Sequence, residues 1–294
     1  TQRSDHGVFH ALACDEWGHE IYTVGFENQS RTVIRALRAF AALYGIAQSE
    51  LLFVDMLNCV NWQMRLGGFL SRQLGWVSLD RPLVLRGTQQ AFPRFVAKIR
   101  RTKEALHPAT AGTAPVPRHR QTYIGTLPGT TFPVGTPEPK VVYSCYGGTH
   151  TSIFCAAYHL EWLPLHRPPT LQEILDLPLF DRLSPGHLGR LFYFGRDRTG
   201  AHVFTLGLGR ARRLIRRAVP GFLASCLGQP PADLWFFDCL SLAGWPLRIG
   251  GLLSRRFNWV RLGRELVARE LRRNWKRYAA IALEARSQVE NGGT

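Results

Sequence analysis

One turn of the chain gathers most of the side chains that could do chemistry. The stretch YSCYGGTHTS, residues 143–152, places a cysteine, two glycines, a histidine and several hydroxyl groups between a predicted strand and a predicted helix. The backbone N–H groups of such a turn attract anions, and the dipole of the following helix adds to the attraction. We therefore predict a site for a small phosphorylated or otherwise anionic ligand. Its candidate ligand-binding residues are Tyr146, Gly147, Gly148, Thr149, His150, Thr151 and Ser152.

Cys145 is the candidate catalytic residue of this turn. The same positive field would lower its pKa and favour the thiolate, which is the nucleophilic form of a cysteine. The alternative to a binding module is therefore a thiol-dependent enzyme, working by phosphoryl transfer or by reduction. A third possibility is a tight turn with a structural role only.

The spacing of the turn is similar to that of two families with a thiol in a phosphate-binding loop. Cys145, Gly148, Thr151 and Ser152 fit the pattern Cys-x-x-Gly-x-x-Thr-Ser of sugar-phosphotransferase IIB subunits. Low-molecular-weight tyrosine phosphatases need an arginine six residues after the cysteine, where this chain has Thr151. The bidentate clamp of an arginine on a phosphoryl group is thus missing from the turn, which argues against phosphatase activity.

A second polar residue is expected at the same edge of the sheet. Ligands of open α/β sheets bind beyond the carboxyl ends of the strands. Cys145 ends one predicted strand and Asp238 ends another, so both are expected to face one crevice, with Asp238 binding the ligand. Capping of the next helix is the alternative role for Asp238.

We expect no metal site and assign no cofactor. Cys155 and His159 lie four residues apart on one predicted helix, but the second close pair that zinc sites usually show is absent. His159 is therefore expected to be a packed, hydrogen-bonded histidine.

The chain repeats itself. GHEIYTVG, residues 18–25, matches GAHVFTLG, residues 200–207, and LLFVDMLNCVNW, residues 51–62, matches LWFFDCLSLAGW, residues 234–245. Such agreement in order and spacing indicates a tandem repeat.

The first copy lacks the opening strand and the glycine-rich turn, because nothing in it corresponds to residues 140–187. We predict a partial first repeat at residues 1–107 and a near-complete second repeat at 140–294. Residues 108–139, rich in Pro, Thr and Gly, are predicted to be an extended linker.

The second repeat alternates predicted strands and helices. VVYSC and LWFFDCL are typical of buried strands, and RTG between two apolar runs indicates a hairpin. Thr170 and Glu173 have the spacing of a capping box, and Pro220 should kink or split its helix. The fold class is α/β, with a mixed sheet of about four strands per complete unit and flanking helices. Helices are expected at 151–162, 170–177, 210–227, 246–257 and 264–287.

Together with HRPPTLQEILDLPLFD and GRDRTGAHVFTLG, the motif YSCYGGTHTS makes the chain similar to a known family. It resembles the domain of unknown function 3189 family of endospore-forming bacteria, a sporulation-associated lineage. The resemblance covers one near-complete copy, residues 140 to about 267, and a partial copy at 6–92. It implies no particular activity, substrate or cofactor.

Composition leaves a third function class open. The 294-residue chain has a formal net charge of +16, and only four of its 37 basic residues are lysines. Nucleic-acid binding or assembly through arginines is thus possible, but the arginines are scattered over many helices and do not favour it. No apolar run is long enough for a membrane span, the first residues are polar, and the six cysteines show no close pairs. We expect a cytoplasmic protein without membrane contact, and the sequence leaves its oligomeric state open.

Overall fold

The computed structural model describes residues 9–14, 20–24, 30–46, 51, 123–242 and 260–292. Residues 1–46 and 122–294 form one compact unit, and residues 47–121 form another. This division does not follow the predicted repeat boundaries, which stay a prediction. The fold below is that of the first unit.

A five-stranded mixed sheet forms the centre of this unit, which confirms the predicted α/β class. Its strand order is β3-β5-β6-β4-β7. Strand β4 pairs in parallel with both β6 and β7, β5 pairs antiparallel with β6, and β3 pairs in parallel with β5. The fifth strand, β3, comes from the segment predicted as a linker. The strands are β3 (Ile124–Thr126), β4 (Lys140–Cys145), β5 (Leu191–Arg196), β6 (His202–Gly207) and β7 (Leu234–Asp238).

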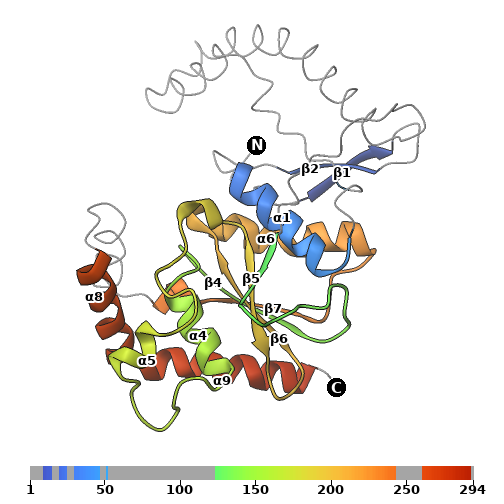
Figure 1. The fold of residues 1–294 in the computed structure, drawn as a ribbon. Helices are drawn as coiled ribbons and strands as arrows, with labels where there is room; N and C mark the ends of the chain where they lie inside the picture. The colour runs from blue at the N-terminus through green and yellow to red at the C-terminus, as the bar shows by residue number, and fades with distance from the viewer. Residues whose placement is uncertain are drawn as a thin grey trace, which may run out of the picture. The chain divides into compact units, whose positions relative to one another are not determined.

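Helices cover both faces of the sheet (Figure 1). Successive side chains of β7 point to opposite faces of the sheet. The ring of Phe236 packs on Phe40, and the ring of the neighbouring Phe237 packs on Tyr143. The face with Phe40 is covered by α1 (Ser30–Leu43) and α6 (Arg212–Leu227). The other face is covered by α4 (Thr151–His159), α5 (Leu171–Leu175), α8 (Val260–Arg273) and α9 (Trp275–Gly292). Three short 3₁₀ helices, η4 (Pro185–His187), η5 (Gly209–Ala211) and η6 (Cys239–Leu242), lie in the connections.

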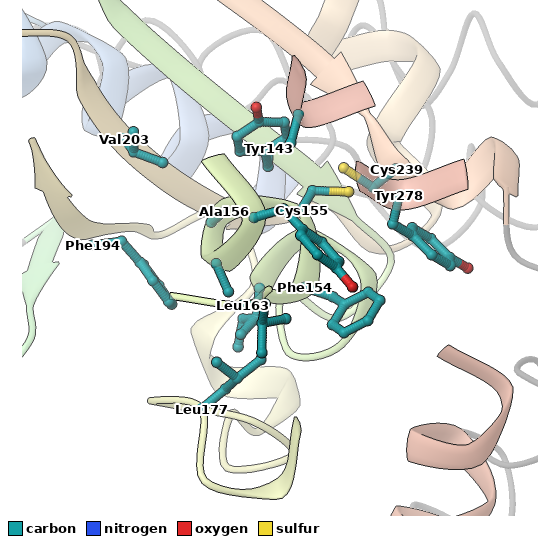
Figure 2. Close-up of a cluster of buried hydrophobic side chains, with 14 of the residues drawn as sticks. Tyr143, Phe154, Cys155, Ala156, Leu163, Leu177, Phe194, Val203, Cys239 and Tyr278 are labelled. Carbon is teal, nitrogen blue, oxygen red and sulfur yellow. The ribbon is translucent and has the colours of Figure 1, made fainter. Parts of the chain in front are cut away.

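The core beneath α4 is aromatic. Phe154 of α4 contacts Tyr158 edge to face, with ring centroids 5.0 Å apart. It contacts Tyr278 in the same way at 5.4 Å (Figure 2). Every residue of α4 and of β4 is buried. This is expected for an apolar helix that packs on a strand with a parallel neighbour on each side. This burial fixes the position of the turn between them.

Helix α1 belongs to the predicted first repeat, yet it packs against the sheet of the second. It follows the hairpin of β1 (Phe9–Cys14) and β2 (Glu20–Val24), as α6 follows the hairpin of β5 and β6, and the two helices contact each other. Arg35 Nη1 donates to the carbonyl of Leu188 at 2.9 Å, and Tyr44 Oη donates to Asp233 Oδ1 at 2.8 Å. The two predicted repeats therefore share one three-layer structure in this unit.

The helix predictions are confirmed in part. The capping box is present, with Glu173 N donating to Thr170 Oγ1 and Thr170 N donating to Glu173 Oε2. Helix α6 runs without a break through Pro220, because buried residues on both sides of the proline hold it against the sheet.

The predicted final helix is two helices, α8 and α9, and the prediction of one helix was wrong. They are separated at Asn274, whose backbone N–H and side-chain amide both donate to the carbonyl of Glu270. The helix expected at 246–257 and the repeat motif at 51–62, apart from Leu51, lie outside the described residues.

Candidate functional site

The cysteine turn lies where the sheet reverses its direction of winding. Strands β4 and β6 are parallel neighbours, and Cys145 pairs with Gly207 at their carboxyl ends. The chain leaves β4 for α4 on one face and leaves β6 for α6 on the other. We call this place the switch point, and it is where open α/β sheets bind their ligands. The predicted site therefore occupies the position that the topology favours.

Glycines allow the two connections at the switch point to touch. Leu208 N donates to the carbonyl of Cys145 at 3.0 Å, and Gly209 N donates to that of Tyr146 at 2.8 Å. Gly148 has a φ of +71°, and a Cβ there would lie 2.7 Å from Gly207 N. The requirement for glycine at position 148 is thus explained by its own backbone and by Gly207, without a ligand.

The sulfur of Cys145 is the centre of the turn. Its side chain is buried, yet Sγ accepts a hydrogen bond from Gly148 N at 3.1 Å and contacts Ser152 Oγ at 3.2 Å. Burial raises the pKa of the thiol, but hydrogen bonds from the side chain and the backbone of Ser152 are the main contributions that outweigh it, so the pKa is lowered. These donors face the sulfur, and the arrangement favours a thiolate.

The other residues of the predicted site have different roles. Thr149 Oγ1 donates to the carbonyl of Leu179 at 3.0 Å, and His150 Nε2 lies 2.9 Å from Asp181 Oδ1. Both bonds tie the turn to the loop after α5. Tyr146 is 44% exposed and Gly147 is buried. Of the predicted site residues, the structure thus brings Cys145, Gly148, Thr151 and Ser152 together around one sulfur atom.

The family model described as "Protein of unknown function (DUF3189)" matches residues 1–104 and 140–286. The chain belongs to this family. The two matched segments correspond to two copies, in agreement with the tandem repeat seen in the sequence. Neither a curated protein nor a solved structure matches the chain. Over the described ranges, none of the helices has the length and apolar character needed to cross a membrane.

Asp238 of this family member lies at the same edge as Cys145 but on the other face of the sheet. Phe237 packs on Tyr143, so the next residue along β7 faces α6. The carboxylate accepts from Arg212 Nη1 at 2.9 and 2.7 Å, and its Oδ1 accepts from Leu240 N at 3.1 Å. The bond to Leu240 N caps η6, a short helix that the sequence analysis did not predict, while the helix expected at 246–257 lies outside the described residues. The alternation of side chains along LWFFD carried the signal for this placement.

His159 is hydrogen-bonded, as predicted. Its Nδ1 lies 2.7 Å from Tyr143 Oη, and its Nε2 lies 2.8 Å from Asp197 Oδ2. Burial raises the pKa of Asp197, but hydrogen bonds from His159, Thr199 and Ala201 overcome it and lower the value to about 2. Sequence analysis missed Asp197, because it lies in the β5–β6 turn and no short spacing links it to α4.

Cys155 faces a second cysteine (Figure 2). The sulfur atoms of Cys155 and Cys239 point toward each other beneath α4 (Figure 2). Burial raises the pKa of Cys239 well above its ordinary value, and the neighbouring Cys155 raises it further. Burial thus disfavours the thiolate of Cys239, whereas the donors around Cys145 favour its thiolate. Among the described residues, no cluster of three or more His, Cys, Asp or Glu side chains could hold a metal ion.

Proposed function

We propose that this protein is a thiol-dependent enzyme that takes the phosphoryl group of a small phosphorylated compound onto Cys145. One observation carries the proposal. Donors from Gly148 and Ser152 converge on a buried sulfur, and the pKa of this thiol is lowered in spite of its burial. A buried thiol without a function has no need of such donors, and burial alone would leave it protonated and inert.

The direction of the donors favours a nucleophile over a simple anion-binding turn. Gly148 N and Ser152 Oγ already contact the sulfur, and the Thr149 hydroxyl already donates to Leu179. The anion that Gly148 N and Ser152 Oγ stabilise in the free protein is therefore the Cys145 thiolate. A bound oxyanion would share this positive field, next to the sulfur.

The proposed step is an in-line displacement. The Cys145 thiolate attacks the phosphorus of a phosphate ester, a sulfur–phosphorus bond forms, and the bond from phosphorus to the ester oxygen breaks. The departing oxygen takes a proton from water. Attack by water or another hydroxyl on the phosphocysteine then releases the phosphoryl group and restores the thiolate.

Binding without covalent chemistry is the second candidate. It is favoured by Thr151 Oγ1, which is buried and has no hydrogen-bond partner in the described part of the chain. A hydroxyl in this state at the first residue of α4 is a donor available to an oxyanion. This candidate uses the same turn, so the experiment must separate it from phosphoryl transfer.

Alkylation with iodoacetamide tests the thiolate. We expect the rate at Cys145, followed by peptide mass spectrometry against pH, to have its midpoint below that of Cys226, the half-buried cysteine of α6. Inorganic phosphate should slow the reaction at Cys145 and leave Cys226 unchanged. Equal midpoints for the two cysteines would overturn the proposal.

A chromogenic aryl phosphate separates chemistry from binding. Phosphoryl transfer predicts release of the phenol and a phosphoryl adduct on Cys145 in the intact mass, both lost in Cys145→Ser. Protection by phosphate with neither product would leave the binding module as the function.

A nucleic-acid partner is not favoured by the contacts of the arginines. Arg35 donates to backbone carbonyls, and Arg212 and Arg216 contact Asp238. Binding of duplex DNA that weakens steeply with salt would restore this alternative.

A further inference from the structure

The residues of the cysteine turn provide no positive side chain to offset the repulsion between the thiolate and an anionic ligand. A thiolate and a phosphoryl group are both anionic, and they must approach within bonding distance. No residue from Cys145 to Ser152 is an arginine or lysine, and His150 is paired with Asp181. A cation must therefore come from another element at the switch point.

Arg212 is the cation that the topology brings there. It is the first residue of α6, three residues after Gly209, whose N–H donates to the carbonyl of Tyr146. Its guanidinium bonds to Asp238 at the end of β7. Because β4 lies between β6 and β7, the ion pair of Arg212 with Asp238 joins elements on the two sides of the strand that carries Cys145.

The bonds to Asp238 hold this guanidinium without using up its donors. Both run from Nη1, and within the described residues Nη2 and Nε donate to no other acceptor, so they are available to a ligand. Asp238 is itself held by Leu240 N, and Arg216 Nη1 approaches it at 3.5 Å. Two guanidinium groups on one carboxylate leave net positive charge at this edge.

We propose that Arg212, oriented by Asp238, is the anion-binding arginine of the Cys145 site and takes the place of the arginine that position 151 lacks. This inference rests on the proposed function. Nη2 and Nε bind two oxygens of the phosphoryl group from the α6 side, while the thiolate attacks from the α4 side. The ligand class that follows is a tetrahedral oxyanion with at least two free oxygens, such as a phosphate monoester.

The test is protection of Cys145 from iodoacetamide by inorganic phosphate, measured on the full chain. Arg212→Gln should raise the phosphate concentration needed for half protection by about tenfold or more, since a charge-assisted bidentate contact is lost. Arg212→Lys keeps the charge without the planar fork and should lie between Arg212→Gln and the wild type. The matched control is Arg213→Gln on the same helix, whose side chain is exposed and which should protect like the wild type.

The outcomes separate the two proposals. If Cys145 is reactive and protected in the wild type but Arg212→Gln is protected equally well, Arg212 has no such role and the proposed function stands. If Arg213→Gln weakens protection as much as Arg212→Gln, the effect is the general field of α6 and the inference fails. If phosphate gives no protection to the wild type, both proposals fail. Thermal melts identify any loss caused by unfolding, and Arg212→Lys then gives the comparison, because it retains the ion pair with Asp238.

Discussion

Two buried polar groups lie two residues apart on β4, and they differ in how their hydrogen bonds are satisfied. Tyr143 belongs to the network with His159 and Asp197, in which both ring nitrogens are bonded and the carboxylate accepts from Thr199 and Ala201 as well. Cys145 has donors gathered on a sulfur that does not need them, beside a Thr151 hydroxyl without a partner. Both groups lie beneath the same helix. A closed network stabilises the fold, whereas the surplus donors around the Cys145 thiol are the reason for the site proposed above.

The largest expected effect concerns the backbone of the turn. Gly148→Val combines a left-handed φ with a clash against Gly207, and should destabilise the protein by about 3 kcal/mol or more in denaturant unfolding. Gly129→Ala is the matched control, because it has a φ of +76° but nothing within 4 Å of the added Cβ. It should cost only about 1 kcal/mol. Equal losses would mean that contact with Gly207 is unimportant.

The next effect tests whether the Tyr143 network is structural. The pKa of Asp197 is lowered to about 2, so its stabilisation is present above the ordinary carboxyl pKa and is lost as the pH falls toward 2. Asp197→Asn should lower the free energy of unfolding by about 2 kcal/mol at pH 7. The difference from the wild type should shrink between pH 4 and pH 2. The alkylation rate of Cys145 should not change.

The control for this prediction is Asp176→Asn, at an exposed position of the chain. It should change the free energy of unfolding by less than about 0.5 kcal/mol at any pH. An altered pH profile of Cys145 alkylation in Asp197→Asn would mean that the Tyr143 network and Cys145 are coupled. The contrast between a structural network and a separate thiol site would then be wrong.

The smallest effect on stability, and the sharpest on the thiol, is expected at Ser152. When the sulfur is ionised, the Ser152 hydroxyl must be the donor, so Ser152→Ala should raise the pKa of Cys145. The pH profile of alkylation measures this shift. The melting temperature should stay nearly constant. An unchanged profile would show that Ser152 does not stabilise the thiolate.

Local patterns in the sequence predicted the parts of the fold that depend on neighbours in the chain. The capping box at Thr170, the β5–β6 hairpin and the strand–turn–helix around Cys145 all follow from residues within a few positions of each other. The addition of β3 to the sheet and the packing of α1 on α6 could not be predicted this way. They depend on contacts between segments far apart in the sequence, which propensity and periodicity do not encode.

The candidate site shows the same limit. The turn and its thiol were predicted, because the spacing of the glycines, hydroxyls and cysteine is recognisable within a few residues of sequence. The partners of Asp238 and His159 were not, because Arg212 and Asp197 reach them only through the sheet order. The alternation of Phe237 and Asp238 was the one available sign that Asp238 faces α6.

The packing of α1 against α6 has a consequence for how the two repeats came to depend on each other. These helices occupy equivalent places after their hairpins, so their contact is one that two separate copies could make only by meeting in solution. Joined in one chain, the copies meet at an effective concentration set by the connecting segment, commonly in the millimolar range for short flexible connections. The contact then survives dilution, and neither copy needs to remain stable by itself. The sequence predicts that the first copy lacks its opening strand, and such a copy could persist under these conditions because its helix α1 still packs on α6.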